Sequence, residues 1–560
     1  MALRWHVIAT IVCLPAFGQS LLSIHPFTAQ RGTTFTATVR GTGLAGASSV
    51  MSGEAPFQVA IEQVAQEPKE LSAGGRTKGP IDLVTIKVTV PETAKPGRYP
   101  IRLIAKSGVT NSLPLHIIEL PVAREPGGAH DTLDEAVPVT KFPTVINGRL
   151  AQRGEADFYS FHAEAGETMT FSVTSGLPQI AAGGSAATIP NFDPSVGIYE
   201  KGDSWFDASR LKRIAYNDET MWVAGRLTNA YLVHRFEKAG DYLLRVEAFA
   251  GQGGPDYSYA VQFAPGTLPE DLPKGGGAWD ERSYTRKIDP ERLTQLAARG
   301  AKSGAKQPVI ETYRSELKLP GMLEGTLGAP GELHRAKFRI DSPTDIAIEI
   351  ETPDAAPPYF NPIVRLLDPS GEEAATNVFA GKGACTGALS KSIQAKTVVP
   401  LRNIGEYTIE IRDAATDLNS PKFRYRVLVR PQVAHIGRVQ IATDAVNLKP
   451  GEAKSLRVMF DREEDYRGAI SIAPESLPQG VSASIGADYE PDTDPPMFPG
   501  KRERYIPRTE RAVVVLSASP DAQPMSEPQM VRLVVRPLAD GKLGDKLLTK
   551  TFPLMVITKQ

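Results

Sequence analysis

The sequence predicts an all-β protein, a tandem array of immunoglobulin-like and jelly-roll-like β-sandwich domains with one short helical linker. Several segments alternate apolar or aromatic residues with polar ones, the period of two that is typical of half-buried antiparallel strands. The 49 glycines and 46 prolines supply turns between such strands. A chain of 560 residues is too long for one hydrophobic core, since a domain takes about 150 residues.

The N-terminus predicts export. Residues 1–18 are predicted to be a signal peptide, because Arg4 and His6 precede an apolar run over residues 7–17. No later apolar run approaches the roughly 20 residues that cross a bilayer, so we expect no transmembrane segment in the mature chain. Cys385 would then be the only cysteine, which excludes an intrachain disulfide. We expect a secreted, periplasmic or cell-surface protein.

Residues 21–120 are predicted to form the first domain. Thr34, Thr36 and Thr38 alternate with apolar residues, as expected for a strand with one solvated face. The opening strands, the glycine turn at 41–43 and the closing strands at 84–105 resemble the IPT/TIG type of immunoglobulin-like domain. The resemblance implies a spacer or an interaction module.

Residues 122–266 are predicted to form the second domain, with strands from Asp157, Thr168, Gly240 and Tyr257. A series of motifs follows one another in a recognisable order: Gly154–Phe161, Ala165-Gly166, Asp193-Pro194, Asn217-Asp218, Gly240–Val246 and Gly253-Gly254. This order resembles the bacterial pre-peptidase C-terminal domain. The resemblance implies a jelly-roll-like β-sandwich.

Residues 267–319 are predicted to be a linker, with a short helix over 289–299 that begins at Asp289 and stops at Gly300. Residues 320–431 then repeat the second domain in degenerate form. Gly148 and Phe161 correspond to Gly325 and Phe338 at one constant offset in numbering. Residues 437–560 are strand-rich and are predicted to form a further immunoglobulin-like sandwich.

Charge and motifs argue against nucleic-acid binding and against catalysis. The formal net charge is −1, so no positive excess would capture nucleic acid. The chain contains no H-E-x-x-H zinc motif, no G-x-S-x-G nucleophile elbow and no dinucleotide-binding glycine loop. We therefore predict that the protein is not an enzyme.

Acidic residues suggest a calcium site in the second domain. Glu125 and Asp131 precede its strands, and Glu155 and Asp157 lie at its first turn. Calcium takes six to eight oxygen ligands, so carboxylates from two adjacent segments have suitable chemistry. The resemblance adds that family members can bind calcium through an acidic linker and a Gly-Asp-x-Asp turn. Here Glu155 replaces the first Asp of that turn, and the alternative is a solvated acidic surface.

Aromatic residues suggest a second candidate site. Trp205, Tyr216 and Trp222 are interleaved with basic residues in a segment that is longer than its counterpart in the second copy. Exposed aromatic rings on loops can stack on sugars or anchor a partner. The alternative is that these rings close the end of the sandwich.

We therefore expect an exported, non-catalytic protein that serves as a binding protein or as a spacer at the cell surface or in the extracellular space. Its expected partner is an extracellular polymer, a cell-surface component or an exported protein. One alternative is an accessory module that assists an exported peptidase. The other is a hydrolase with an unrecognised interdomain site. Carboxylates with strongly shifted pKa values in an interdomain cleft would favour the hydrolase, whereas a flat aromatic patch would favour binding.

Overall fold

A computed structural model describes most of the chain. The described residues are 19–68, 80–105, 107–128, 130–176, 192–201, 211–217, 230–248, 251–266, 279–280, 310–313, 316–329, 331–352, 360, 362–382, 389–413, 423–487, 508–539 and 541–558. Within these ranges every regular element is a β-strand except one 3₁₀ turn, η1 (Leu133–Glu135), so the predicted all-β fold class is confirmed. No helix among them has the length and apolar composition that a membrane crossing requires.

Two predictions lie outside the described residues. These are the signal peptide over 1–18 and the linker helix over 289–299.

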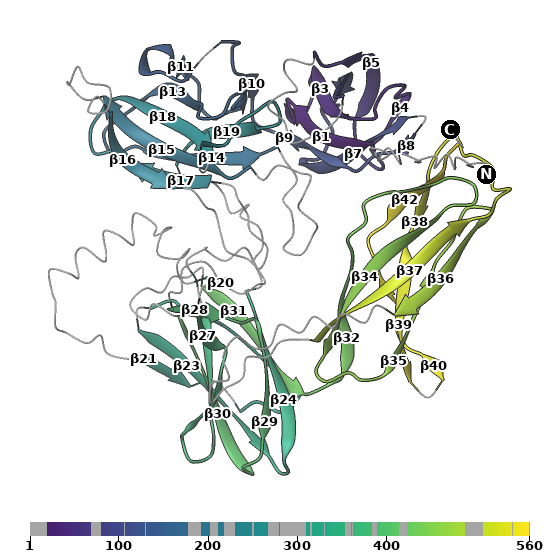
Figure 1. Cartoon of the computed structure of the whole chain (residues 1–560). Helices are drawn as coiled ribbons and strands as arrows, with labels where there is room; N and C mark the ends of the chain where they lie inside the picture. Colours follow the sequence, from purple (N-terminus) through teal and green to yellow (C-terminus); the bar gives the residue numbers. More distant parts are fainter. Residues whose placement is uncertain are drawn as a thin grey trace, which may run out of the picture.

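The first sandwich packs a four-stranded and a five-stranded sheet around one core (Figure 1). One sheet has the order β1 (Ser20–His25), β3 (Thr34–Thr42), β6 (Asp82–Thr89), β5 (Gln58–Gln66). The other has the order β2 (Thr28–Gln30), β9 (Leu113–Ile118), β7 (Gly97–Ala105), β4 (Ser49–Met51), and β8 (Gly108–Val109) pairs with β7. The inward residues Val39, Ile86 and Leu103 are fully buried.

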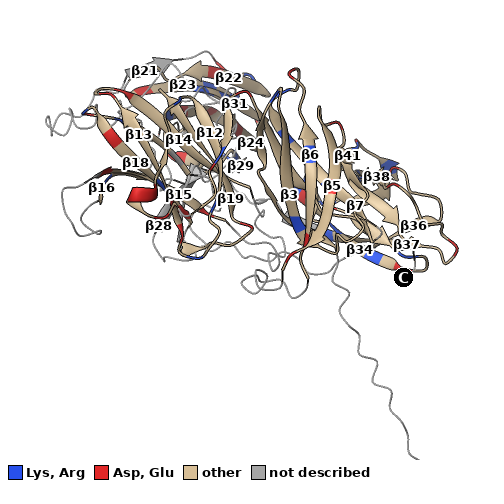
Figure 2. Cartoon of the chain, turned by 90° about the horizontal axis from the view of Figure 1, so that it is seen from above, with Lys and Arg blue, Asp and Glu red and all other residues tan. Residues whose placement is uncertain are grey.

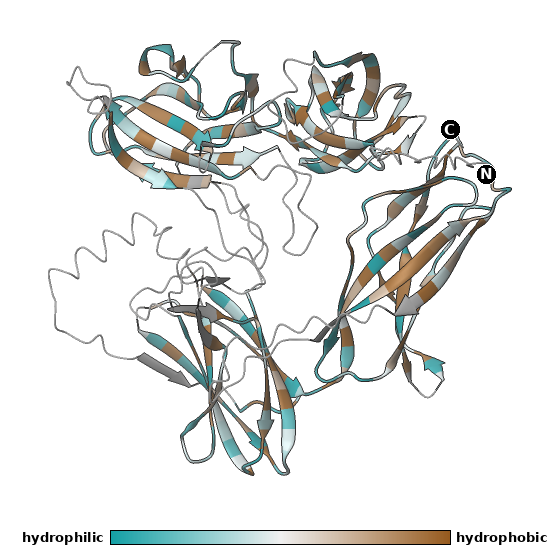
Figure 3. Ribbon diagram, in the orientation of Figure 1, coloured by the Kyte–Doolittle hydropathy of each residue, from teal (hydrophilic) through white to brown (hydrophobic). Residues whose placement is uncertain are grey.

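The second sandwich packs two five-stranded sheets. One has the order β10 (Val122–Arg124), β12 (Thr144–Arg149), β19 (Ser258–Pro265), β14 (Thr168–Ser175), β17 (Ala230–Arg235). The other has the order β11 (Val137–Pro138), β13 (Ala156–Ala163), β18 (Gly240–Ala248), β15 (Pro194–Lys201), β16 (Leu211–Asn217). The alternation predicted for β13 is confirmed, because Tyr159, Phe161 and Ala163 are buried while His162 is exposed. Figure 3 shows the same banding of apolar and polar residues along the strands of every sandwich.

The third sandwich repeats the strand order of the second. One sheet has the order β21 (Ile310–Tyr313), β23 (Glu332–Ile340), β30 (Gly405–Asp413), β25 (Pro362–Leu367), β26 (Glu373–Thr376). The other has the order β22 (Gly321–Thr326), β31 (Arg424–Pro431), β24 (Thr344–Glu351), β29 (Lys396–Leu401). A further small sheet has the order β20 (Trp279–Asp280), β28 (Leu389–Ile393), β27 (Val378–Lys382). Residues 279–280 and 310–313, inside the predicted linker, are therefore strands: β21 runs parallel to β23, as β11 does to β13.

One glycine–tyrosine pair recurs at the same place in both of these sandwiches. Gly148 on β12 pairs with Tyr259 on β19, and Gly325 on β22 pairs with Tyr425 on β31. A Cβ at Gly148 would lie 2.3 Å from the Tyr259 ring, and one at Gly325 would lie 2.5 Å from the Tyr425 hydroxyl. Each tyrosine thus covers its glycine, and no other residue fits beneath the ring.

The fourth sandwich comprises three sheets. The first sheet has the order β32 (His435–Ile441), β34 (Ala453–Glu463), β37 (Arg508–Ala518), β36 (Val481–Ala487). The second has the order β33 (Val446–Leu448), β42 (Phe552–Val556), β38 (Gln529–Val531). The third has the order β35 (Ala469–Pro474), β39 (Leu533–Ala539), β40 (Lys542–Leu543), and β41 (Leu547–Leu548) pairs with β39. They share one core in which Val514, Leu516 and Leu554 are fully buried.

The first sandwich contacts both its neighbour in sequence and the last sandwich (Figure 1). Val145 and Ala260 of the second sandwich belong to the core cluster of the first. On its far side Arg102 forms an ion pair with Asp444 at 2.8 Å, across 342 positions in the sequence. Asn447 exchanges two hydrogen bonds with the backbone of Val109 nearby. The array therefore closes on itself instead of extending as a rod.

Charged residues of both signs are interspersed over the array in the view of Figure 2. This distribution accords with the net charge of −1.

Candidate functional site

A polar pocket of about 610 Å³ lies where the first sandwich meets the second. A pocket of this size can accommodate a small molecule or one residue of a polymer. Its walls come from β1, β3, β6 and the residue after β5 of the first sandwich, and from residues 124–128, His130, the turn after β12 and the loop before β19 of the second. The lining residues are Ser23, His25, Thr38, Arg40, Glu67, Leu83, Arg124, Glu125, Pro126, Gly127, Gly128, His130, Arg149, Ala151, Glu155 and Pro255.

Buried ion pairs hold the two sandwiches together beside this pocket. Arg40 on β3 donates to Glu67 at 2.9 and 2.6 Å and to Asp256 of the second sandwich at 2.7 Å. Ser23 donates to the same Asp256 carboxylate at 2.6 Å. Arg40 and Glu67 keep only 6% side-chain exposure, so both charges are paired and desolvated together. The pocket is therefore preformed by a fixed junction.

Asn147 adds a second tie across the junction. Its amide accepts from the Thr28 backbone N–H at 3.2 Å and donates to the Thr28 carbonyl at 2.9 Å. The side chain thus pairs with β2 as a further strand residue would.

Acidic side chains gather at the edge of the pocket that belongs to the second sandwich. Asp157 on β13 is 1% exposed and accepts a hydrogen bond from the Tyr259 hydroxyl at 2.5 Å. The hydroxyls of Tyr159 and Tyr259 lie 2.7 Å apart, and Tyr159 donates to Glu125 at 3.1 Å. The backbone N–H of Arg149 donates to the other Glu125 oxygen at 2.8 Å. Two buried carboxylates are thus joined through two phenols.

All four acidic residues predicted from the sequence act on one another electrostatically. Burial, together with the charges of Glu125, Glu155 and Asp131, raises the pKa of Asp157 to about 8, against the opposing hydrogen bond from Tyr259. Burial also raises the pKa of Glu125 and of Glu155, against opposing hydrogen bonds from backbone N–H groups. We call Glu125, Asp131, Glu155 and Asp157 the acidic cluster. Within it, the negative charges oppose one another's ionisation.

The donor chemistry of the acidic cluster suits a hard cation such as calcium. Its ligands are carboxylate oxygens, and the cluster charges repel one another when no cation is present. Across the described part of the chain, however, no three His, Cys, Asp or Glu side chains converge in a metal-holding arrangement. Backbone carbonyls and water would have to complete the coordination sphere.

The third sandwich has a different side chain at the position that corresponds to Asp157. His334 occupies the position of Asp157 and is fully buried. Its Nδ1 lies 2.5 Å from the Tyr425 hydroxyl, and its Nε2 lies 2.6 Å from Glu332. Glu332 occupies the position of Glu155, and its hydrogen bond with His334 helps to lower its pKa. An imidazole in the third sandwich thus replaces a carboxylate in the second.

The structure describes only one member of the predicted aromatic patch. Trp205 and Trp222 lie outside the described residues. Tyr216 on β16 is 39% exposed, with the Arg213 guanidinium 4.8 Å from its ring centroid.

The sequence did not predict that two tyrosines would contact the acidic cluster, or that basic side chains would line the pocket. Tyr159 and Tyr259 alternate like core residues, and they are fully buried. The available signal was that each is a tyrosine and not a phenylalanine, since a buried phenol requires a polar partner. His25, Arg124 and Arg149 carry no comparable signal, because β10 and β12 bring the two arginines near each other and only the docking of the first sandwich adds His25.

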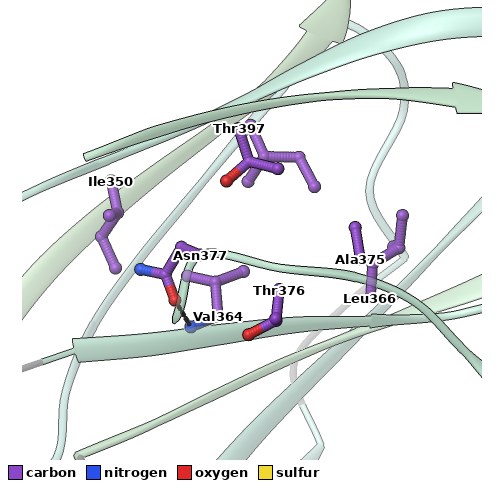
Figure 4. A pocket seen from close by; sticks show the side chains of 8 residues that line it. Ile350, Val364, Leu366, Ala375, Thr376, Asn377 and Thr397 are labelled. Carbon is purple, nitrogen blue, oxygen red and sulfur yellow. Dashed lines mark hydrogen bonds between the residues drawn. The ribbon is translucent and has the colours of Figure 1, made fainter. Parts of the chain in front are cut away.

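A second cavity lies inside the third sandwich (Figure 4). It measures about 10 Å³ and is lined mainly by apolar side chains such as Ile350 and Leu366, while Asn377 accepts from the Val364 backbone at 2.8 Å. This volume holds at most one water molecule, so the cavity is a packing void.

Comparisons with known proteins give partial structural similarities. No protein-family model matches the sequence, and no curated protein matches it. The pre-peptidase C-terminal domain of a Bacillus anthracis collagenase is 14% identical and covers 22% of this chain and 100% of its own, with a TM-score of 0.15. A periplasmic inhibitor of g-type lysozyme from Aeromonas hydrophila is 16% identical and covers 26% of this chain and 98% of its own, with a TM-score of 0.16.

A Bacteroides ovatus protein from a mixed-linkage glucan utilization locus, solved with a mixed-linkage heptasaccharide, is 10% identical and covers 69% of this chain and 71% of its own, with a TM-score of 0.13. These scores assign the chain to no family.

Proposed function

We propose that this chain is an exported, non-catalytic array of sandwiches that binds an extracellular polymer, a cell-surface component or an exported protein. The observation that supports this most directly is the preformed polar pocket at the junction of the first two sandwiches. Buried ion pairs fix its walls, so a ligand would enter without first ordering them.

Calcium is part of the proposal. The acidic cluster would supply Glu125, Asp131, Glu155 and Asp157 oxygens, and a bound cation would remove their mutual repulsion. Extracellular calcium modules have dissociation constants of about 10⁻⁴ to 10⁻³ M. With a dissociation constant near 0.2 mM, about 2 mM calcium would stabilise the second sandwich by roughly 1.4 kcal/mol.

Calorimetric melting of the full chain, with calcium and with chelator, tests this. Wild type should show a transition that calcium raises, and Asp157→Asn should abolish that response. Glu332→Gln is the matched control, because it removes the corresponding carboxylate of the third sandwich and should leave the calcium response intact. An equal response in wild type and Asp157→Asn would contradict the calcium site.

One observation favours hydrolysis as a second candidate function. Glu125 and Glu155 line the interdomain pocket, and both carboxyls have raised pKa values, as a general acid requires. Against this, the most strongly shifted group, Asp157, is sealed beneath Tyr259. Turnover of fluorogenic glycoside and peptide substrates that Glu125→Gln abolishes would establish hydrolysis in place of simple binding.

A further inference from the structure

The interdomain pocket is lined by charges of both signs. Arg40 is neutralised within the wall by Glu67 and Asp256. The remaining carboxylates, Glu125 and Glu155, belong to the acidic cluster. The remaining cations are Arg124 and Arg149 of the second sandwich, and His25 of β1 lines the same pocket.

This second group consists of His25, Arg124 and Arg149, which we call the basic end of the pocket. Arg124 donates to the Thr36 carbonyl at 2.9 Å, a neutral partner that leaves its charge uncompensated. Arg149 makes no side-chain hydrogen bond or ion pair with any described residue; its backbone N–H donates to Glu125, and its charge acts on the Glu155 carboxyl from a distance. Two arginines therefore face a cavity without a bonded carboxylate.

The charges of Arg149 and Arg124 both act on the His25 imidazole. Burial and, after it, the charges of Arg149 and Arg124 together lower the pKa of His25 to about 4, so its imidazole is neutral near pH 7. Its Nδ1 atom is buried and has no hydrogen-bond partner within the described structure. An unpaired buried polar atom costs free energy that a ligand can recover.

We propose that the basic end of the pocket binds an oxyanion group of the ligand, a carboxylate or a sulfate, through Arg149 and Arg124 with His25 beside them. A guanidinium can bind such a group through two parallel N–H···O bonds. The inference rests on the proposed binding function, and it deepens that function by naming the chemical class of the ligand: an acidic polymer unit or an acidic small molecule.

The position of the acidic cluster adds a consequence. Glu125 and Glu155 line the same pocket beside Arg149, so a ligand bound through its oxyanion also meets these two carboxyls. Neutral hydroxyl groups or a cation suit them, and a second anionic group does not. A uronic acid, with one carboxylate and several hydroxyls, meets both requirements better than a ligand with two closely spaced acids.

Titration calorimetry of the full chain in chelator, with sodium sulfate and sodium glucuronate as probes and sodium chloride at equal ionic strength as reference, tests the inference. Both probes should bind above the chloride reference. Because a hydrogen bond to a charged group contributes about 1.5–3 kcal/mol, Arg149→Gln and Arg124→Gln should each weaken binding roughly ten- to hundredfold. Arg31→Gln is the matched control, since Arg31 is an exposed arginine of the first sandwich paired with Glu119 outside the pocket.

The two probes, together with the melting experiment in calcium and in chelator, separate the outcomes. Binding of glucuronate alone would identify a planar carboxylate as the recognised group, and binding of sulfate alone a tetrahedral one. Heat no greater than that of chloride, or equal affinity in Arg149→Gln and Arg31→Gln, would overturn the inference. Oxyanion binding that persists while the calcium response is absent would remove calcium from the proposed function and leave this inference standing.

Discussion

Glu464 connects the third and fourth sandwiches, and replacing it by glutamine should weaken their junction. Its side chain is fully buried and accepts two hydrogen bonds from Arg430, at 2.8 and 2.6 Å. Lys396 forms an ion pair with it, and the Val433 backbone N–H donates to it at 2.7 Å. Glutamine has the same shape but no charge, so Glu464→Gln removes the charge without creating a cavity.

The magnitude follows from the pKa of this carboxyl. Burial raises the pKa of Glu464, but the hydrogen bonds from Arg430 and Lys396 outweigh burial and lower it from 4.5 to about 2. That difference corresponds to at most about 3 kcal/mol of the free energy of unfolding at neutral pH. Arg430 and Lys396 keep 18% and 20% side-chain exposure, and the resulting solvent screening reduces the expected loss to roughly 2–3 kcal/mol.

The sign of the pH dependence is fixed by the same shift. Because the folded-state pKa lies below the unfolded-state value, this stabilisation is complete above about pH 4.5 and is lost as the pH falls toward 2. The difference between wild type and Glu464→Gln should therefore shrink over that interval.

Calorimetric melting, together with hydrogen exchange of the Val433 amide, measures this effect. Asp465→Asn is the matched control, because Asp465 is the next residue, also has a left-handed backbone and pairs only with the exposed Arg467. Equal losses in the two variants, or a difference that does not change between pH 7 and pH 3, would refute the reasoning.

Two further predictions concern the closed array and the aromatic segment. Replacing Arg102 by methionine and Asn447 by alanine together removes the ion pair with Asp444 and the hydrogen bonds to Val109. The first and fourth sandwiches should then separate and small-angle scattering should give a larger radius of gyration, whereas an unchanged radius would contradict closure through these contacts. Replacing Trp205 and Trp222 by alanine should abolish binding to native envelope material with little change in melting temperature. A fall of many degrees would show that the rings are core, since truncating a buried tryptophan costs about 3–5 kcal/mol.

The sequence by itself determined the strands and the faces they bury. Tyr159 and Phe161 lie inside the second sandwich because a strand turns alternate residues to opposite sides, and that alternation depends only on neighbouring residues. The correspondence of Gly148 with Gly325 was equally readable, because both copies need the same glycine beneath a tyrosine. The four residues of the acidic cluster were also named from sequence, since they lie close together along the chain.

Only the tertiary structure decided which distant residues meet. Asp157 and Tyr259 are 102 positions apart, and Arg40 and Asp256 are 216 positions apart. The first contact depends on how the two sheets of one sandwich pack, and the second on how two sandwiches dock. Neither leaves a local pattern in the chain, so the pocket and its basic end could not be predicted from residue spacing. Long-range packing made a pocket from residues that each looked like ordinary surface.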